Sequence, residues 1–387
     1  MLQALPSISV HPKNRNVRDI VKYPRKIRIQ FLEQRIARNG DRRVGSAYPR
    51  ITRQARTRTN TSNKEYRMEV ASKHRSLTFT SIAAMVAILL LSIAACTGKG
   101  ERSATSARFG EANVGTPPAT WPEPGPMQKI EPGITLYEVT LPKGNVSSKL
   151  WVYLPERPGQ KKLPCILIGP AGSRLFHGKF LGNGDRPEHL PYVRAGFAVI
   201  AYEVDGSMSD KPDDNELTFA ARAFKKADAG VANARAALDY AIAKFPAIDA
   251  DHIYAAGHSS AATLSLLVSE YEPRIKACIA YAPVCNVVSH LGDQTIASLA
   301  RMVPEFREFI GNSSPDKSPT KLTCPVFLFH ANDDSVVSTT QVMTFAMTLK
   351  KTNPDVVVVQ VAKGNHYDSM IREGIPKGIQ WLKGLSG

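Results

Sequence analysis

A serine stands at the tip of a predicted tight turn, in the order Gly-His-Ser-Ser-Ala from Gly257 to Ala261. The mainly apolar residues 252–256 before the turn favour a buried strand, and the small and apolar residues after it favour a helix that runs to Val268. A strand and a helix approach closely at such a turn, so a bulky side chain beside the serine would clash. The turn would hold the Ser259 hydroxyl above the sheet, where a substrate carbonyl can reach it. We therefore predict that Ser259 is a nucleophile.

An acid and a base follow two later strands of the predicted sheet. Asp334 lies in a polar turn after the apolar residues 324–330, and His366 follows the apolar residues 355–361. Serine is a poor nucleophile at neutral pH, so a histidine must take its proton and later deliver it to the leaving group. A carboxylate fixes the tautomer of that histidine and stabilises its charged form. Because the carboxyl ends of parallel strands meet at one edge of a sheet, we expect Ser259, Asp334 and His366 to form a catalytic triad.

The tetrahedral intermediate of acyl transfer also needs two hydrogen-bond donors for its oxyanion. One is the backbone N–H of Ser260, which directly follows the predicted nucleophile. The second should come from the loop after the predicted strand 165–168, where the sequence reads Gly-Pro-Ala-Gly. Because Pro170 has no N–H, we expect Ala171 to be the second donor, with Gly172 as the next candidate.

Other polar residues near these segments have weaker signals. We interpret His258 and His330, which flank the predicted machinery, as packing or orienting residues. Glu203 and Asp205 follow another predicted strand, where they could line the pocket or form a loop. The Cys and His residues have no spacing typical of a zinc site, so we expect no metal and no cofactor.

Strands and helices alternate along the part of the chain that would position these residues. Alternating residues over 134–141 and 149–154 predict an antiparallel hairpin at the edge of a sheet. Continuous apolar runs predict parallel strands that are covered on both faces, at 163–168, 197–202, 252–256, 275–283, 324–330 and 355–361. We expect helices at 217–245, 295–309 and 375–382. This order indicates an α/β fold of right-handed βαβ units, with a mostly parallel central sheet and helices on both faces.

Residues 134–385 resemble an α/β-hydrolase. The turn at Ser259 is similar to the G-x-S-x-G nucleophile elbow of that fold, and the order of Ser259, Asp334 and His366 is the order that the fold requires. Residues 329–337 resemble the H-G-x-x-D-x-x-V segment that carries the triad acid, and its offset selects Asp334 rather than Asp333. The resemblance thus implies the same three residues as the chemistry does.

Residues 248–259 and 318–326 are most similar to the branch of dienelactone hydrolases and prolyl oligopeptidase catalytic domains. The chain departs from the pattern at Ala261, which replaces a glycine, and at residues 169–171, where the family has His-Gly-x. Because the loop at residues 169–171 lacks the histidine of the family, the identity of the second oxyanion donor stays open. The resemblance implies a serine hydrolase that acts on a small ester through an acyl-enzyme. A serine peptidase of the prolyl oligopeptidase type and a non-catalytic surface lipoprotein with a binding function are the alternatives.

The net charge of +16 belongs to the N-terminal part of the chain. Residues 1–75 hold 19 lysines and arginines against 5 acidic residues, whereas the remaining chain holds 31 against 29. The folded domain is therefore nearly neutral, and we expect no nucleic acid as its partner. Residues 1–67 have few apolar clusters, which is typical of a disordered or wrongly assigned N-terminal extension.

Met68 begins a second plausible N-terminus. Basic residues precede the apolar run 82–95, whose 14 residues are few for a membrane span and typical of a signal peptide. The run ends in Ile-Ala-Ala-Cys, which resembles a bacterial lipobox, where a peptidase cuts before a cysteine that is then lipidated. We expect translation to start at Met68, a signal peptide over 68–95, and a lipid anchor on Cys96 in the bacterial cell envelope. A type II signal anchor and an organellar targeting segment are alternatives.

The remaining chain divides into a linker and the folded domain. Residues 96–130 are rich in Pro, Gly, Ser and Thr, which predicts a tether without a core of its own. The catalytic domain would span 131–387, with 287–321 as a possible cap over the site. We interpret the cysteines of this domain as buried small hydrophobic residues, and a bridge between Cys278 and Cys285 stays open for an exported protein.

Overall fold

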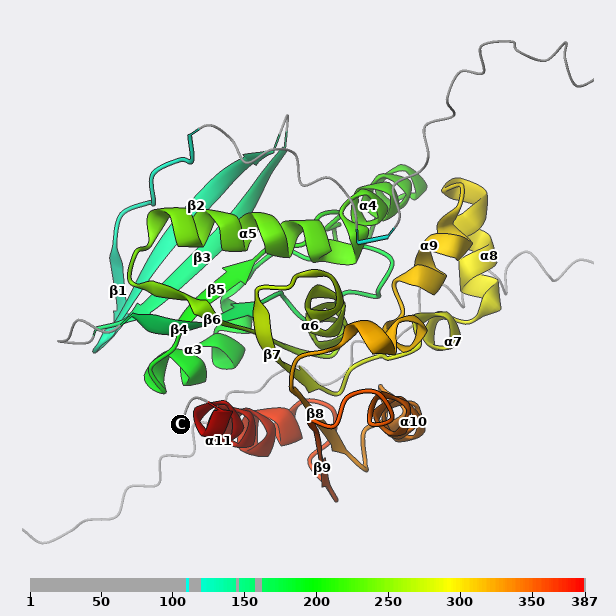
Figure 1. Ribbon diagram of the computed structural model, residues 1–387. Coiled ribbons are helices and arrows are strands. Elements are labelled where there is room, and N and C mark those ends of the chain that lie inside the picture. The colour runs from blue at the N-terminus through cyan, green and yellow to red at the C-terminus, as the bar shows by residue number, and fades with distance from the viewer. Residues whose placement is uncertain (1–108, 111–119, 144–145, 157–161, 386–387) are drawn as a thin grey trace, which may run out of the picture. The chain divides into compact units, whose positions relative to one another are not determined.

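The computed structural model describes residues 109–110, 120–143, 146–156 and 162–385 (Figure 1). The predicted extension, signal peptide and lipidation site at Cys96 lie outside these residues. Within them, no helix has the length and apolar character needed to cross a membrane.

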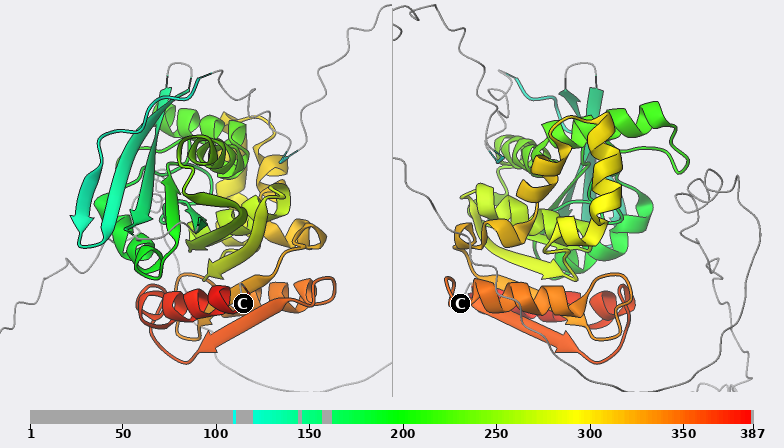
Figure 2. Two further views of the ribbon diagram at one scale, coloured as in Figure 1. Left: turned by 60° about the vertical axis from the view of Figure 1, so that its left-hand side comes forward. Right: turned by 90° about the vertical axis from the view of Figure 1, so that its right-hand side faces the viewer.

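Nine strands of the described residues form one sheet in the order β1-β2-β3-β5-β4-β6-β7-β8-β9. The antiparallel strands are β1 (Gln128–Glu131), β2 (Ile134–Lys143) and β3 (Val146–Pro155). The parallel strands are β4 (Leu163–Ile168), β5 (Ala198–Tyr202), β6 (Ile248–His258), β7 (Ile275–Tyr281), β8 (Val326–Ala331) and β9 (Val356–Val361). The mostly parallel sheet with an N-terminal antiparallel hairpin is therefore confirmed. Figure 2 shows its strong twist, since β1–β3 (cyan) run in a clearly different direction from the last strands (orange).

The hairpin was wrongly expected at the edge of the sheet. β1 lies outside it and pairs with β2 through Gln128 opposite Leu136. Only four residues form β1, with the sequence Gln-Lys-Ile-Glu. Four residues that are mostly polar have no apolar periodicity, and the sequence therefore did not reveal β1.

Helices cover both faces of the sheet (Figures 1 and 2). They are α3 (Arg186–Arg194), α4 (Asp214–Lys226), α5 (Val231–Lys244), α6 (Ser260–Tyr271), α7 (Val287–Leu291), α8 (Asp293–Met302), α9 (Phe306–Asn312), α10 (Thr339–Leu349) and α11 (Ile375–Leu385). Successive side chains of a strand point to opposite faces. In β4, Cys165 and Leu167 join the core under α4, α5, α6 and α10, whereas Ile166 and Ile168 join the core under α3 and α11.

The single helix expected over 217–245 is in fact two helices. Between α4 and α5 the backbone of Asp228, Ala229 and Gly230 has positive φ values of 48°, 55° and 99°. An α-helix cannot continue through this left-handed conformation, which only glycine adopts without strain. The alanine-rich composition concealed the break, because Gly230 was its only marker in the sequence.

The helix expected over 295–309 is also broken, into α8 and α9. Pro304, which lacks an N–H, stands between them, and Glu305 has a left-handed φ of 61°. The segment 287–321 also contains α7 and two short 3-10 turns at Pro315–Lys317 and Pro319–Lys321. The proposed role of this segment as a cap stays a prediction.

Parts of the predicted tether pack against the domain. The Phe109 ring lies 5.4 Å from that of Tyr271, and the Gly110 N–H donates to Asp228 at 3.0 Å. Trp121 meets Tyr240 edge to face at 5.6 Å. Phe109, Gly110 and Trp121 are thus held against the domain, which the Pro- and Gly-rich composition of the segment did not predict.

Candidate active site

Ser259 lies between the end of β6 and the start of α6. Its backbone has φ 55° and ψ −121°, a conformation that is strained for a residue other than glycine. The Ser259 N–H donates to the Tyr281 carbonyl at 2.9 Å, and the Ser259 carbonyl accepts from Ala262 and Thr263 at 3.0 and 3.1 Å. Hydrogen bonds on both sides therefore hold the strained residue, and its side chain is half-buried.

The close approach of β6 and α6 explains the small residues around Ser259. A Cβ on Gly257 would collide with the backbone carbonyl of Ala261. Ala261 itself is 1% exposed in the first turn of α6, so its methyl group fits where the resembling motif has glycine. The turn needs glycine at the first of these positions and tolerates alanine at the second.

The structure brings Asp334 and His366 together from the ends of β8 and β9. The His366 Nδ1 lies 2.7 Å from the Asp334 Oδ2. The other Asp334 oxygen accepts from the N–H groups of Val336 and Val337 at 2.8 and 3.0 Å. Because the carboxylate accepts at Nδ1, the neutral imidazole carries its hydrogen there and leaves Nε2 free to accept a proton.

The environment of Asp334 favours its charged form. Burial acts to raise the pKa of this carboxyl, but the hydrogen bonds from His366, Val337 and Val336 outweigh burial and lower the pKa below its ordinary value of 3.8. Asp334 is therefore an anion at neutral pH, as a residue that stabilises an imidazolium must be.

Asp333 has a different task from its neighbour. Its exposed carboxylate accepts from the backbone N–H groups of Gly364 and Asn365 at 3.1 and 2.8 Å. These two residues precede His366 in a loop with φ values of 128° and 52°. Asp333 thus ties the turn after β8 to the loop after β9, a role that sequence reasoning missed.

Within the described residues, no hydrogen bond joins the Ser259 hydroxyl to His366. Catalytic hydrogen bonds are often long without substrate and tighten in the substrate complex. The elbow and the histidine loop are connected instead through His258, whose Nε2 lies 2.9 Å from the His366 carbonyl oxygen.

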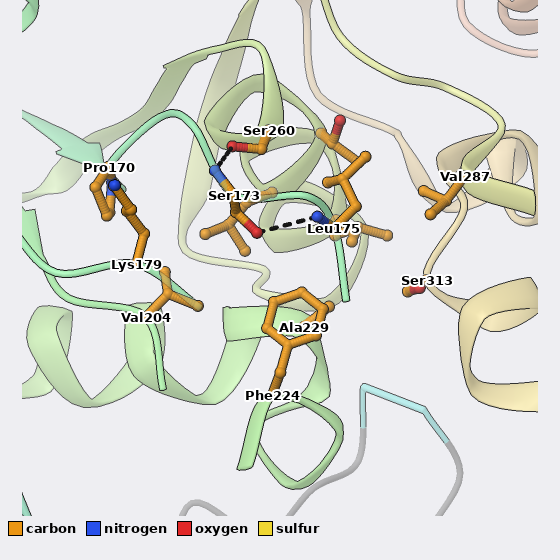
Figure 3. Close-up of a pocket in the computed structure, with 13 residues that line it drawn as sticks. Pro170, Ser173, Leu175, Lys179, Val204, Phe224, Ala229, Ser260, Val287 and Ser313 are labelled. Atoms are coloured by element: carbon orange, nitrogen blue, oxygen red, sulfur yellow. Dashed lines mark hydrogen bonds between the residues drawn. The ribbon is translucent and has the colours of Figure 1, made fainter. Parts of the chain in front are cut away.

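The two expected oxyanion donors belong to adjacent segments. Neither the Ser260 nor the Ala171 N–H donates to another group of the described residues. The Ser173 N–H donates to the Ser260 hydroxyl at 3.0 Å, and this bond fixes the loop after β4 against the start of α6 (Figure 3). Unpaired N–H groups at a helix N-terminus favour negative charge, as an oxyanion requires.

A small cavity of about 20 Å³ lies behind this loop (Figure 3). Its lining includes Pro170, Ser173, Leu175 and Ser260 but none of the three predicted triad residues. A space of this size holds about one water molecule. The cavity is therefore too small for a substrate group.

His177 stabilises the same loop and was missed by sequence reasoning. Its Nδ1 lies 2.6 Å from the Gly178 carbonyl, and its Nε2 accepts from the Arg174 N–H at 3.3 Å. The Ser173 hydroxyl donates to the His177 carbonyl. Burial lowers the pKa of His177 to about 4, so the ring is neutral at physiological pH. No spacing relates His177 to the other site residues, so only the structure could reveal its role.

The remaining polar candidates of the sequence position loops. Buried Glu203 accepts from the backbone N–H groups of Lys149 and Leu181 at 2.9 and 3.2 Å, and Asp205 accepts from Asn233 at 2.8 Å. These bonds favour the loop interpretation for both carboxylates.

His330 is also buried, with its Nε2 3.7 Å from the Asp334 Oδ2. Burial lowers the pKa of His330, which makes the ring a neutral packing neighbour of the acid.

The cysteines and possible metal ligands form no further site in the described domain. Cys165, Cys278, Cys285 and Cys324 are free thiols, and the first three are buried. The bridge left open between Cys278 and Cys285 is therefore not formed. In the part of the chain that the structure describes, no three His, Cys, Asp or Glu side chains lie where they could hold a metal ion.

Several solved structures have a similar fold. An acetyl xylan esterase from Paenibacillus sp. R4 has a TM-score of 0.52 at 15% identity, over 70% of this chain and 90% of that chain. An S-formylglutathione hydrolase from Agrobacterium tumefaciens has a TM-score of 0.52 at 12% identity, over 69% of this chain and 100% of that chain. The acylaminoacyl peptidase of Pyrococcus horikoshii has a TM-score of 0.51 at 16% identity, over 65% of this chain but only 41% of that chain.

At these identities the likeness shows the fold alone, which is that of the α/β-hydrolases. No curated protein sequence matches the chain. Residues 188–383, which are about half of the chain, match the sequence profile of the prolyl oligopeptidase family, Peptidase_S9. The matched segment begins in α3 and includes the strained serine, the buried aspartate and the histidine that it binds. The chain belongs to the prolyl oligopeptidase family.

Proposed function

We propose that the domain is a serine hydrolase, most simply a carboxylesterase, that cleaves a small ester through an acyl-enzyme. The observation that carries this proposal is the 2.7 Å hydrogen bond between Asp334 and His366, in a chain whose strained Ser259 occupies the strand-to-helix turn. A binding protein would have no use for a buried carboxylate that orients an imidazole.

The reaction would begin when the Ser259 Oγ attacks the ester carbonyl and His366 Nε2 accepts the hydroxyl proton. The anionic Asp334 stabilises the imidazolium that forms. Collapse of the tetrahedral intermediate breaks the bond to the alcohol, which leaves with the proton from His366. A water molecule then attacks the acyl-enzyme by the same route and releases the acid and free Ser259.

The oxyanion of both tetrahedral intermediates would be bound by the N–H groups of Ser260 and Ala171. Support comes from the lack of other acceptors for these donors among the described residues and from the Ser173–Ser260 bond that holds their segments together. Loss of one such donor typically costs about 10²- to 10³-fold in kcat.

A serine peptidase is the second candidate, and membership of the prolyl oligopeptidase family favours it. The solved structures with this fold include an acetyl xylan esterase, an S-formylglutathione hydrolase and an acylaminoacyl peptidase, so the fold supports both esterases and peptidases. The chain spans only 41% of the length of the acylaminoacyl peptidase.

Matched substrates separate the two candidates. We propose to compare the p-nitrophenyl ester and the p-nitroanilide of one N-acetylated amino acid, which differ only in the bond that is cleaved. An esterase hydrolyses the ester alone at a rate that Ser259→Ala abolishes. Anilide hydrolysis that depends on Ser259 would favour the peptidase, and folded wild-type protein without either activity would favour the non-catalytic binding module.

A further inference from the structure

His258 contacts the segment that carries His366, and the mechanism above does not use it. It is the last residue of β6 and is directly followed by Ser259. The residue is buried, with 4% of its surface exposed. The His258 Nε2 lies 2.9 Å from the His366 carbonyl oxygen, and the two imidazole rings have centroids 4.6 Å apart.

The chemistry of this contact fixes a hydrogen on the His258 ring. A carbonyl oxygen can only accept, so the His258 Nε2 must carry a hydrogen and donate it. The Nδ1 on the opposite side of the ring faces the Glu188 carboxyl of α3 at 3.6 Å, which is an ion-pair distance and longer than a hydrogen bond. Both side chains are buried, so the His258 ring is held between a carboxyl group and the backbone of the histidine loop.

The contact complements two others that position His366 and its loop. Asp334 binds the imidazole itself, and Asp333 binds the backbone N–H groups that precede it. His258 binds the carbonyl of the histidine and packs against its ring. Among these three residues, only His258 is covalently attached to Ser259.

We propose that His258 is a positioning residue that sets the separation between the nucleophile Ser259 and the base His366. This inference rests on the proposed serine hydrolase function. Because β6 fixes the His258 backbone and the turn fixes Ser259, the bond to the His366 carbonyl determines how far the histidine loop lies from the elbow. A displacement of about 1 Å between reacting groups can cost about 10²-fold in rate.

Two substitutions test the hydrogen bond separately from the space that the ring fills. His258→Leu keeps a similar volume without a donor, whereas His258→Gln can place an amide N–H near the position of Nε2. We expect His258→Leu to lower kcat for a p-nitrophenyl ester by roughly 10- to 100-fold. We expect KM to change little, because His258 does not touch the substrate, and His258→Gln to recover most of the lost kcat.

His258→Asn provides a shorter amide, which reaches only the position of Nδ1 and should fail to rescue. It also replaces His258→Leu if the leucine variant does not fold, which thermal unfolding of each variant establishes. Equal kcat losses in the glutamine and asparagine variants, or wild-type kcat in folded His258→Leu, would overturn the positioning role while leaving the proposed function intact. A folded wild type without any activity that depends on Ser259 would overturn the proposed function and the positioning role together.

Discussion

His366 owes its position to two adjacent aspartates in the turn after β8 and to a histidine at the end of β6. Asp334 binds its ring, Asp333 binds the loop before it, and His258 binds its carbonyl. The sequence predicted only the first of these contacts, because the motif offset distinguishes Asp334 from Asp333. The other two contacts are made to backbone atoms, and a backbone atom gives no signal in the residue types of a sequence.

The lowered pKa of Asp334 predicts how its contribution to stability depends on pH. A carboxyl whose folded-state pKa is lowered stabilises the fold above its unfolded-state value of 3.8, and this contribution is lost as the pH falls through the folded-state pKa. Asp334→Asn removes the charge at every pH. We therefore expect the difference in unfolding free energy between wild type and this variant to be constant near neutral pH and to shrink below about pH 4.

Urea unfolding of the two proteins across this range measures the effect. Asp333→Asn, which removes the carboxylate of the exposed neighbour, is the matched control. A difference between wild type and Asp334→Asn that grows as the pH falls below 4 would contradict the lowered pKa.

Among the elements, β6 and α6 show which features of the fold a sequence reveals. The turn that joins them at Ser259 followed from an apolar run, small residues and a second apolar run, although β6 begins earlier, at Ile248, and α6 ends later, at Tyr271, than expected. The breaks at Gly230 and Pro304 were missed because the residues on both sides of each break also favour helix. A strand buried on both faces is thus readable from composition, whereas a kink depends on the tertiary contacts that stabilise it.

The tight packing of the elbow predicts opposite outcomes for two small substitutions. Gly257→Ala adds a methyl group that meets the backbone of Ala261, and overpacking of this kind costs about 1–3 kcal/mol. Ala261→Gly restores the glycine of the resembling motif and costs about 1 kcal/mol or less. We expect ester hydrolysis to fall strongly in the first variant and to stay near the wild-type level in the second. Equal stability and activity in both variants would show that the backbone approach is not tight.

Glu270 of α6 predicts a second pH effect, of opposite sign. This carboxyl is buried without a hydrogen-bond partner among the described residues, and burial raises its pKa to about 9. Its neutral form fits the fold, so stability is complete below the unfolded value of 4.5 and is lost as the pH rises towards 9. The unfolding free energy of Glu270→Gln should therefore exceed that of the wild type by about 3 kcal/mol at pH 7, and the two values should be equal near pH 4.

Thermal or urea unfolding at both pH values checks this expectation. Glu308→Gln, on the surface of α9, is a suitable control that should leave the pH trend unchanged. A Glu270→Gln variant that is less stable than wild type at pH 7 would indicate that the charged carboxylate has a partner after all.

At the scale of the whole molecule, the domain extends further towards the N-terminus than composition suggested. Phe109 and Trp121 attach the described parts of the predicted tether to α5, α6 and α9. A lone aromatic residue in a Pro- and Gly-rich segment has no periodicity, so sequence patterns could not show where it packs. The fold class and the parallel strands around the site were predictable because they depend on long apolar runs.

The predicted lipobox leads to an expectation for the complete chain. We propose that the chain is lipidated on Cys96 and retained at the membrane. Expression in a bacterial host with labelled palmitate should label the wild type and place it in the membrane fraction. Cys96→Ala should lose both the label and the membrane association, whereas Cys324→Ser, within the domain, should keep them. Equal labelling of wild type and Cys96→Ala would contradict lipidation at this residue.

The most direct test of the central claim is to locate the covalent adduct of a fluorophosphonate probe, which forms a bond to an activated serine oxygen as fluoride leaves. We predict a single adduct on Ser259, which mass spectrometry of peptides from the labelled protein would locate. It should be absent from Ser259→Ala and still present in Ser209→Ala, which changes an exposed serine before α4. Folded wild-type protein that forms no adduct, or forms it on another residue, would contradict the assignment of Ser259 as the nucleophile.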